Sequence, residues 1–154
     1  MKARLANSDD SESLIVNALR CLESRLRYHS TLLNNSRDVF AYLRLQLAEE
    51  TNETFAVLFL NSQNRLLAFE KLFCGSIHET VVYPRIIVQK ALAHNAAKII
   101  LAHNHPSGDC KPSLADKATT ELVQKTLRLV DVEVVDHVIV SHQKWYSFAE
   151  NGLL

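Results

Sequence analysis

The segment that decides the fold covers residues 98–116 and reads KIILAHNHPSGDCKPSLAD. It begins with a short apolar run, KIILA, which is typical of a buried strand. A loop containing two prolines and a glycine follows, and helical periodicity then runs from Ser113 to about Val130. The sequence therefore predicts a strand, a tight loop and a helix in direct succession.

Further strands and helices are expected on both sides of this segment. Upstream, the apolar runs TFAVLFLN and LLAFEKLF are separated by the turn-forming SQNR and predict a β-hairpin, and residues 78–83 form a further extended piece. Pro84 opens a helix that leads to Asn95, and downstream VEVVDHVIVS and WYSF supply the last strands. Strands before and after two helices predict an α/β fold of the α+β sandwich type, with a mixed sheet flanked by helices.

Two amphipathic helices are expected before the hairpin. The first has an apolar stripe from Leu14 to Leu26, and the second begins near Ser36. Because no linker rich in proline or glycine follows them, we expect residues 1–52 to form a helical extension packed on a core domain at residues 53–154. The leucine stripes are expected to join the core, with a homodimer interface as the alternative.

Composition limits the classes of protein to consider. A chain of 154 residues matches one ordinary domain, and 17 basic residues balance 17 acidic ones, so no long-range positive field favours nucleic acid as a partner, although a local basic patch stays possible. No apolar run approaches the roughly 20 residues that would span a bilayer, and the first residues do not resemble a signal peptide. No membrane partner is therefore expected. The three cysteines form no C-x-x-C pair, which favours a protein of the reducing cytoplasm.

The loop segment carries residue types that bind metal ions. His103 and His105 are two positions apart, and this spacing places both imidazoles on one side of an extended chain. Asp116 lies in the first turn of the following helix, which the loop at residues 106–112 can fold back over the strand end. Two imidazoles and a carboxylate suit one Zn²⁺ per chain, with the fourth position open to a water molecule. An open zinc site of this kind favours hydrolysis.

At this point the pattern resembles a known family. The spacing H-x-H, seven residues, then S-x-x-D is similar to the JAMM signature of MPN domains. More closely, HNHPSG, the following PS-x-x-D, YPR, DH-x-I-V and SFAENGLL resemble the RadC-like JAB proteins of bacteria, the UPF0758 type, from about Glu53 to Leu154. The resemblance implies a cytidine-deaminase-like MPN fold and a zinc metalloprotease activity on a peptide or protein substrate, with hydrolysis of a peptide or isopeptide bond.

The resemblance also implies roles for two further residues. Glu53 matches the glutamate that holds the reacting water and moves its proton, and Glu49 and Glu50 are the alternatives for that role. Ser113 matches the serine that donates a hydrogen bond to the developing oxyanion. Ser113 and Asp116 are in addition expected to cap their helix.

Several alternatives remain beside this interpretation. Residues 1–52 lack the glycine-bearing hairpins of a helix-hairpin-helix region, and the chain has no room for the insertions with which eukaryotic relatives hold ubiquitin. The main alternative is a non-catalytic or DNA-repair-associated RadC-like module that keeps the metal-binding fold. A cysteine hydrolase using Cys110 is the third possibility. Asp136 and His137 form either a pair that orients a metal ligand or a strand-end turn.

Overall fold

One mixed β-sheet with helices on both faces forms the body of the protein. The computed structural model describes residues 6–28, 36–47, 49–75 and 80–154. The strands are β1 (Thr54–Leu60), β2 (Leu66–Cys74), β3 (Lys98–Asn104), β4 (Glu133–Val140) and β5 (Trp145–Ser147), and the helices are α1 (Ala6–Tyr28), α2 (Ser36–Leu47), α3 (Pro84–Ala93) and α4 (Leu114–Arg128). The predicted α+β fold is confirmed.

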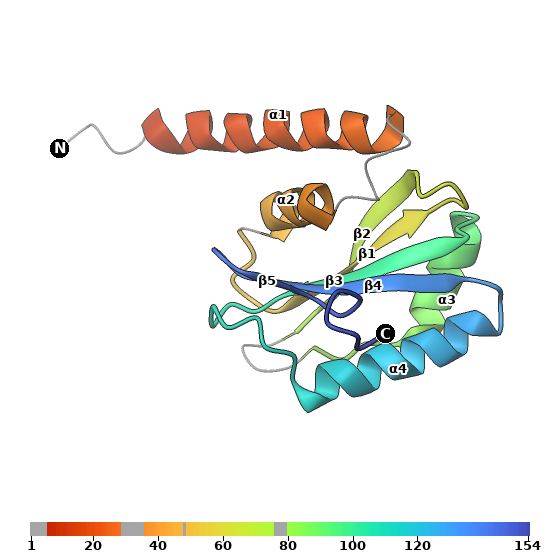
Figure 1. Ribbon diagram of the computed structural model, residues 1–154. Coiled ribbons are helices and arrows are strands. Elements are labelled where there is room, and N and C mark those ends of the chain that lie inside the picture. The colour runs from red at the N-terminus through yellow and green to blue at the C-terminus, as the bar shows by residue number, and fades with distance from the viewer. Residues whose placement is uncertain (1–5, 29–35, 48, 76–79) are drawn as a thin grey trace.

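The strand order places β3 at the centre of the sheet, with β1 and β4 on either side. The order is β2-β1-β3-β4-β5, with β3 and β4 parallel and the other neighbours antiparallel. The connection between the two parallel strands runs through α4 on one face of the sheet (Figure 1). Every residue of β1 is buried, because helices cover both of its faces, and this explains why the strand reads as a continuous apolar run.

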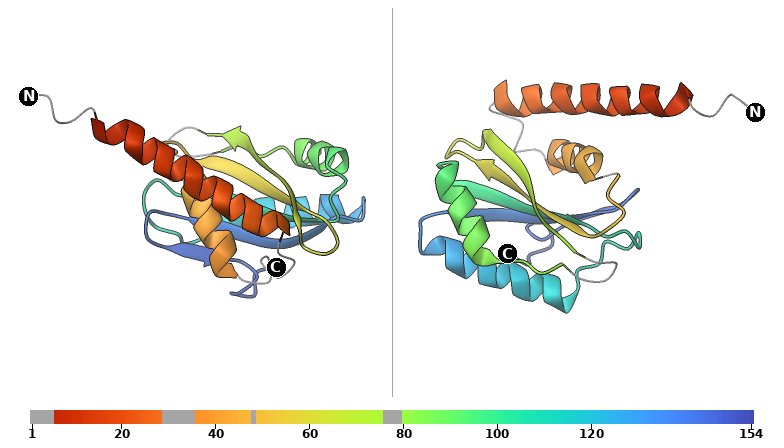
Figure 2. Two further views of the ribbon diagram at one scale, coloured as in Figure 1. Left: turned by 90° about the horizontal axis from the view of Figure 1, so that it is seen from above. Right: turned by 180° about the vertical axis from the view of Figure 1, so that it is seen from behind.

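Two layers of apolar side chains fill the space on either side of the sheet. On one face, α2 inserts Tyr42 and Leu43, which have no exposed surface. On the other face, Ile87 of α3 and Leu127 of α4 are fully buried against the sheet. The views from above and behind show α2 on the face opposite to α3 and α4 (Figure 2). The candidate site lies at the C-terminal end of the central strand β3, between these layers.

Helix α1 lies outside this sandwich, across α2 and near β2 (Figures 1 and 2). Leu22 packs against the α2-side core and Glu23 accepts a hydrogen bond from the hydroxyl of Tyr42, whereas Leu14 is 70% exposed. A division into residues 1–52 and 53–154 stays a prediction, as does a homodimer interface on these helices. Among the helices that the structure describes, none combines the length and the apolar character needed to cross a bilayer.

The prediction of an extended strand-like piece at residues 78–83 is only partly open to comparison. Residues 78 and 79 lie outside the described residues. Residues 80–83 do not join the sheet, although Tyr83 has an extended backbone as the N-cap of α3. The segment instead leads directly into the helix that Pro84 begins, since proline suits the first helical position.

Candidate metal centre

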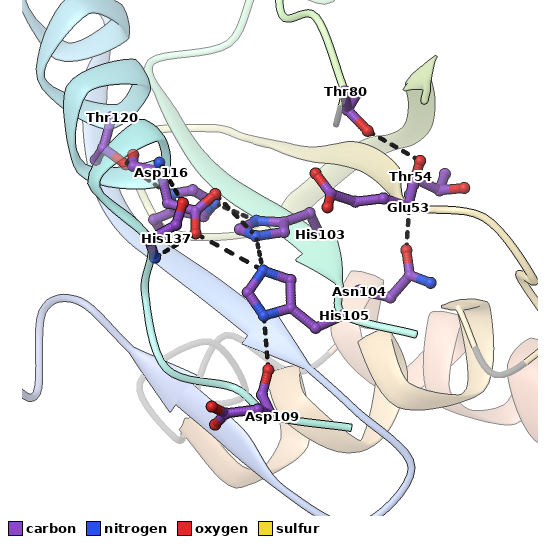
Figure 3. A network of polar contacts seen from close by, with 11 residues as sticks. Glu53, Thr54, Thr80, His103, Asn104, His105, Asp109, Asp116, Thr120 and His137 are labelled. Atoms are coloured by element: carbon purple, nitrogen blue, oxygen red, sulfur yellow. Dashed lines mark hydrogen bonds and ion pairs between the residues drawn. The ribbon is translucent and has the colours of Figure 1, made fainter. Parts of the chain in front are cut away.

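The end of β3 and the start of α4 bring three predicted ligands together (Figure 3). His103 Nε2 lies 3.0 Å from His105 Nε2 and 3.2 Å from Asp116 Oδ1, and His105 Nε2 lies 3.7 Å from Asp116 Oδ2. All three side chains can place a ligand atom within 4.8 Å of the others. The structure therefore assembles the predicted trio from a strand, a loop and a helix.

The loop that joins β3 to α4 reverses the direction of the chain, because one of its residues adopts a left-handed backbone conformation. Gly108 has a φ of +89°, a region that residues with a Cβ rarely enter, and its N–H donates to the carbonyl of His105 at 3.0 Å. This turn sends the chain back toward the strand end, where α4 begins. A capping box then fixes the helix start: Ser113 Oγ accepts from Asp116 N, and Asp116 Oδ2 accepts from Ser113 N. The predicted cap is confirmed, and it leaves Asp116 Oδ1 facing the histidines.

The chemistry of the converging atoms fits a cation. His105 Nδ1 lies 2.6 Å from the carbonyl oxygen of Asp109, which can only accept, so this nitrogen carries the ring proton and donates it. Neutral His105 therefore turns a bare Nε2 toward His103 and Asp116. Imidazole nitrogens and a carboxylate oxygen meeting at these distances form a donor set that Zn²⁺ takes. His103, His105 and Asp116 are thus the described residues that could hold the metal.

The electrostatics of the cluster agree with this donor set. Burial alone would raise the pKa of Asp116, but hydrogen bonding to His103 and His105 outweighs it and holds the pKa of that carboxyl well below its usual range. Asp116 in turn raises the pKa of His105, against the opposing effect of burial, and the charge of Glu53 adds a smaller contribution in the same direction. Asp116 is therefore held in its carboxylate form, which is the form that binds a metal ion.

A cleft of about 500 Å³ opens beside the trio and contains both predicted catalytic residues. Glu53 immediately precedes β1, and its carboxylate extends toward the histidines (Figure 3). Ser113 lines the same cleft together with His105 and Asp116. Because Ser113 Oγ accepts from Asp116 N, its own proton is free to donate to a bound molecule. The structure thus brings Glu53, Ser113, His105 and Asp116 to one cleft, while His103 is buried beside it in contact with His105 and Asp116.

The segment that carries Glu53 is held by residues that the sequence analysis did not select. The carbonyl of Glu53 accepts from Thr80 Oγ1 at 3.0 Å and from Gly75 N at 2.8 Å. The side chain of Asn104 accepts from Thr54 N at 2.7 Å and donates to the carbonyl of Asn52 at 3.1 Å. A signal for Asn104 was present in the alternation of β3, which directs the residue between two ligand histidines to the opposite face.

His137 is the second residue whose position only the structure gives in full. It is fully buried within β4, which excludes the strand-end turn, and its Nε2 lies 2.8 Å from His103 Nδ1, so the alternative of contact with a predicted ligand holds for His137. Burial lowers the pKa of His137 well below its ordinary value. Asp136 instead accepts from Ser147 Oγ and from Ala149 N, away from the ligands. Burial raises the pKa of Asp136 despite these hydrogen bonds.

The alternative residues for catalysis are engaged elsewhere. Glu50, an alternative to Glu53, forms an ion pair with Lys71 at 2.6 Å, which lowers the pKa of Glu50. The thiol of Cys110 is buried and donates to the carbonyl of Lys144 at 3.1 Å, and burial raises its pKa. A thiol with a raised pKa is a poor nucleophile, so the geometry gives no support to a cysteine hydrolase.

An α+β sandwich with two histidines at the end of its central strand and an aspartate in the first turn of the following helix is consistent with the class of JAB/MPN domains. The chain belongs to the RadC-like JAB domain family, which matches residues 33–153. A UPF0758 protein of Methylibium petroleiphilum is 53% identical over 137 residues, which cover 89% of this chain and 61% of that protein. The UPF0758 proteins YkfG and YeeS of Escherichia coli K12 are 48% and 46% identical over 92% of this chain, and the matches cover 89% and 96% of their own lengths.

The chain spans about three fifths of the length of the M. petroleiphilum relative. A second UPF0758 protein, from Verminephrobacter eiseniae, is 53% identical, and the match covers 57% of its length. Both E. coli relatives match along nearly their whole length. The family therefore includes chains of about this size and longer ones that carry additional sequence.

Proposed function

We propose that this protein is a zinc-dependent hydrolase of JAMM type that cleaves an amide bond in a peptide or an isopeptide linkage. The observation that carries the proposal is the convergence of the His103, His105 and Asp116 ligand atoms beside a cleft that also contains Glu53 and Ser113. A zinc ion held by the three ligands would supply Lewis acidity and lower the pKa of water toward neutrality. The family membership supports the fold and is compatible with this activity.

The protein's own residues divide the remaining work. The carboxylate of Glu53 takes a proton from the attacking water and passes it to the leaving nitrogen, as a general base and then a general acid. The hydroxyl of Ser113 donates a hydrogen bond to the oxygen of the scissile carbonyl as negative charge develops there. Phe55 and Val82 give the cleft apolar walls, which strengthen both interactions by excluding water.

The alternative, a RadC-like module that keeps the fold without cleaving a substrate, is equally compatible with the family. It predicts that a metal binds and that Glu53 can be replaced without consequence. A DNA-associated version also predicts retention on DNA that weakens with salt. Replacement of Glu53 therefore distinguishes the two functions, because only the hydrolase depends on its carboxylate.

The first experiment measures zinc per chain in protein purified without chelator or metal-affinity tag. We expect close to one zinc in the wild type and a sharp loss in Asp116→Ala. The matched control is Asp109→Ala, because Asp109 contacts His105 only through its backbone carbonyl. If the folded wild type bound neither zinc nor other divalent metal ions at neutral pH, the hydrolase proposal would be refuted.

The second experiment compares zinc-loaded wild type with Glu53→Gln on panels of peptide and isopeptide substrates. We expect Glu53→Gln to keep its zinc and to cleave about 10²- to 10⁴-fold more slowly, since general acid–base catalysis contributes factors of that order. Equal rates in the two proteins would exclude Glu53 as the base. Absence of any cleavage by zinc-loaded wild type would favour the non-catalytic alternative.

A further inference from the structure

A closed ring of polar contacts begins on the Nδ1 side of His103 and returns to its Nε2 side (Figure 3). His103 Nδ1 contacts His137 Nε2 at 2.8 Å, and His137 Nδ1 contacts Thr120 Oγ1 at 2.6 Å. Thr120 Oγ1 also lies 2.6 Å from the backbone carbonyl oxygen of Asp116. The carboxylate of Asp116 closes the ring at the other ring nitrogen of His103, where Asp116 Oδ1 lies 3.2 Å from His103 Nε2. The ring joins β3, β4 and α4.

The protons in this ring can point in two directions, with opposite consequences for a metal. In one direction His103 carries its proton on Nδ1 and turns a bare Nε2 toward His105 and Asp116. In the other direction Nε2 is protonated, donates to Asp116 and cannot bind a metal ion. The group that fixes the direction of these protons therefore decides whether His103 can bind a metal ion.

The hydroxyl of Thr120 makes the selection. The carbonyl oxygen of Asp116 can only accept, and two oxygens 2.6 Å apart require a proton between them, so the single hydroxyl proton of Thr120 lies there. Thr120 Oγ1 is then left as the acceptor for His137 Nδ1–H. His137 is enclosed by the rings of Phe55 and Phe148 and has no exposed surface, which favours an imidazole with one ring proton. Its Nε2 is consequently bare and accepts from His103 Nδ1–H.

We infer that Thr120 and His137 are positioning residues that hold the ring proton of His103 on Nδ1 and so keep its Nε2 free for the metal. The inference rests on the proposed zinc site, because it concerns how one ligand of that site is prepared. Partners that fix the tautomer of a ligating histidine typically account for about 10- to 100-fold in metal affinity.

The test combines a tautomer measurement on metal-free protein with zinc titration. Two-bond ¹H–¹⁵N NMR correlations at mildly alkaline pH distinguish a protonated from a bare ring nitrogen in each histidine. We expect His103 in the wild type to be protonated on Nδ1, and Thr120→Val to shift it toward protonation on Nε2. The same substitution should weaken zinc binding about 10- to 100-fold. Thr120→Ser keeps the hydroxyl and should restore both properties.

Thr126→Val is the matched control, because Thr126 also lies on α4 and its hydroxyl donates to the carbonyl four residues earlier, that of Leu122, at 2.8 Å. It contacts no histidine and should change neither the tautomer nor the affinity. A wild-type His103 protonated on Nε2 would overturn the inference without any variant. So would Thr120→Val that keeps both the Nδ1–H tautomer and the wild-type affinity.

Failure of the inference and failure of the proposed function give different results. If zinc binds the wild type and Thr120→Val equally, the positioning roles are wrong while the metal site stands. If the wild type binds no zinc, the proposed function fails, and the NMR measurement on metal-free protein still decides the direction of the ring.

Discussion

Asn104 shows how one residue between two ligands can serve a different purpose from both. Its neighbours His103 and His105 face the candidate metal position, whereas its amide reaches back to the segment before β1. Asn104 is buried, and its Oδ1 is the acceptor for the buried N–H of Thr54. The strand end thus carries the ligands on one side and holds the Glu53 segment on the other.

We predict that Asn104→Ala lowers the free energy of unfolding of the metal-free protein by about 1–3 kcal/mol, because a buried N–H loses its acceptor. The measurement is urea unfolding. Asn61→Ala is the control, since Asn61 Oδ1 also accepts from two backbone N–H groups, those of Gln63 and Arg65, but in an exposed turn where water can replace it. Equal losses in the two variants would contradict a special role for the buried amide.

At the scale of elements, the start of α4 combines a structural and a chemical task. Ser113 caps the helix through Asp116 N, and the carboxylate of Asp116 returns the hydrogen bond while facing the histidines. The capping box therefore fixes a ligand by the same contacts that begin the helix.

Substitutions of Ser113 should separate these tasks. Ser113→Ala is expected to cost about 0.5–2 kcal/mol of unfolding free energy through loss of the cap, whereas Ser113→Asp keeps a capping oxygen and stays near wild-type stability. Both variants lack the hydroxyl proton, so both should lose the oxyanion hydrogen bond and cleave more slowly. Thermal unfolding and substrate cleavage measured side by side check this, and an active Ser113→Asp would refute the oxyanion role.

The first two helices should differ in their contribution to stability. Leu43 of α2 is fully buried, so we expect Leu43→Ala to lower the unfolding free energy by about 2–5 kcal/mol. Leu14 of α1 is 70% exposed, and Leu14→Ala should stay within about 0.5 kcal/mol. Chemical denaturation of the two variants gives both values. A large loss from Leu14→Ala would indicate that the exposed face of α1 is covered in solution, as a homodimer interface would require.

For the whole molecule, the candidate metal site connects a central strand to a helix on one face of the sheet. A ligand that binds only the folded state stabilises it by mass action, by about 2.7 kcal/mol at a concentration 100 times its dissociation constant. We therefore predict that zinc raises the melting temperature of the wild type and leaves that of Asp116→Ala unchanged. A shift of equal size in both proteins would show that zinc binds elsewhere.

The zinc-dependent stabilisation should also depend on pH. Asp116 raises the pKa of His105, so His105 takes up a proton at a higher pH than an ordinary histidine does. Because this proton must leave before a metal binds, zinc affinity is full above the raised pKa and falls as the pH drops through it. Melting curves with and without zinc across that range measure the effect. If zinc raised the melting temperature by the same amount at a pH low enough to protonate His105, the ligand role of His105 would be contradicted.

The sequence by itself determined the elements and the metal chemistry of this protein. The apolar runs predicted all five strands, and amphipathic periodicity with Pro84 and Ser113 predicted where α3 and α4 begin, because these signals are local. The spacing of His103, His105 and Asp116 also predicted their convergence, since strand alternation and a short loop constrain neighbours along the chain.

Only the tertiary structure decided how those groups are supported. Thr120, His137 and Asn104 reach their partners across 17, 34 and 50 or more residues, through strand pairing and helix packing that local periodicity does not encode. The register of β3 against β4 places His137 on the His103 side of the sheet, and burial between aromatic rings then disfavours a charged imidazole. The ligands could be read from the chain because they are close in sequence, whereas the residues that orient them meet only when the sheet forms.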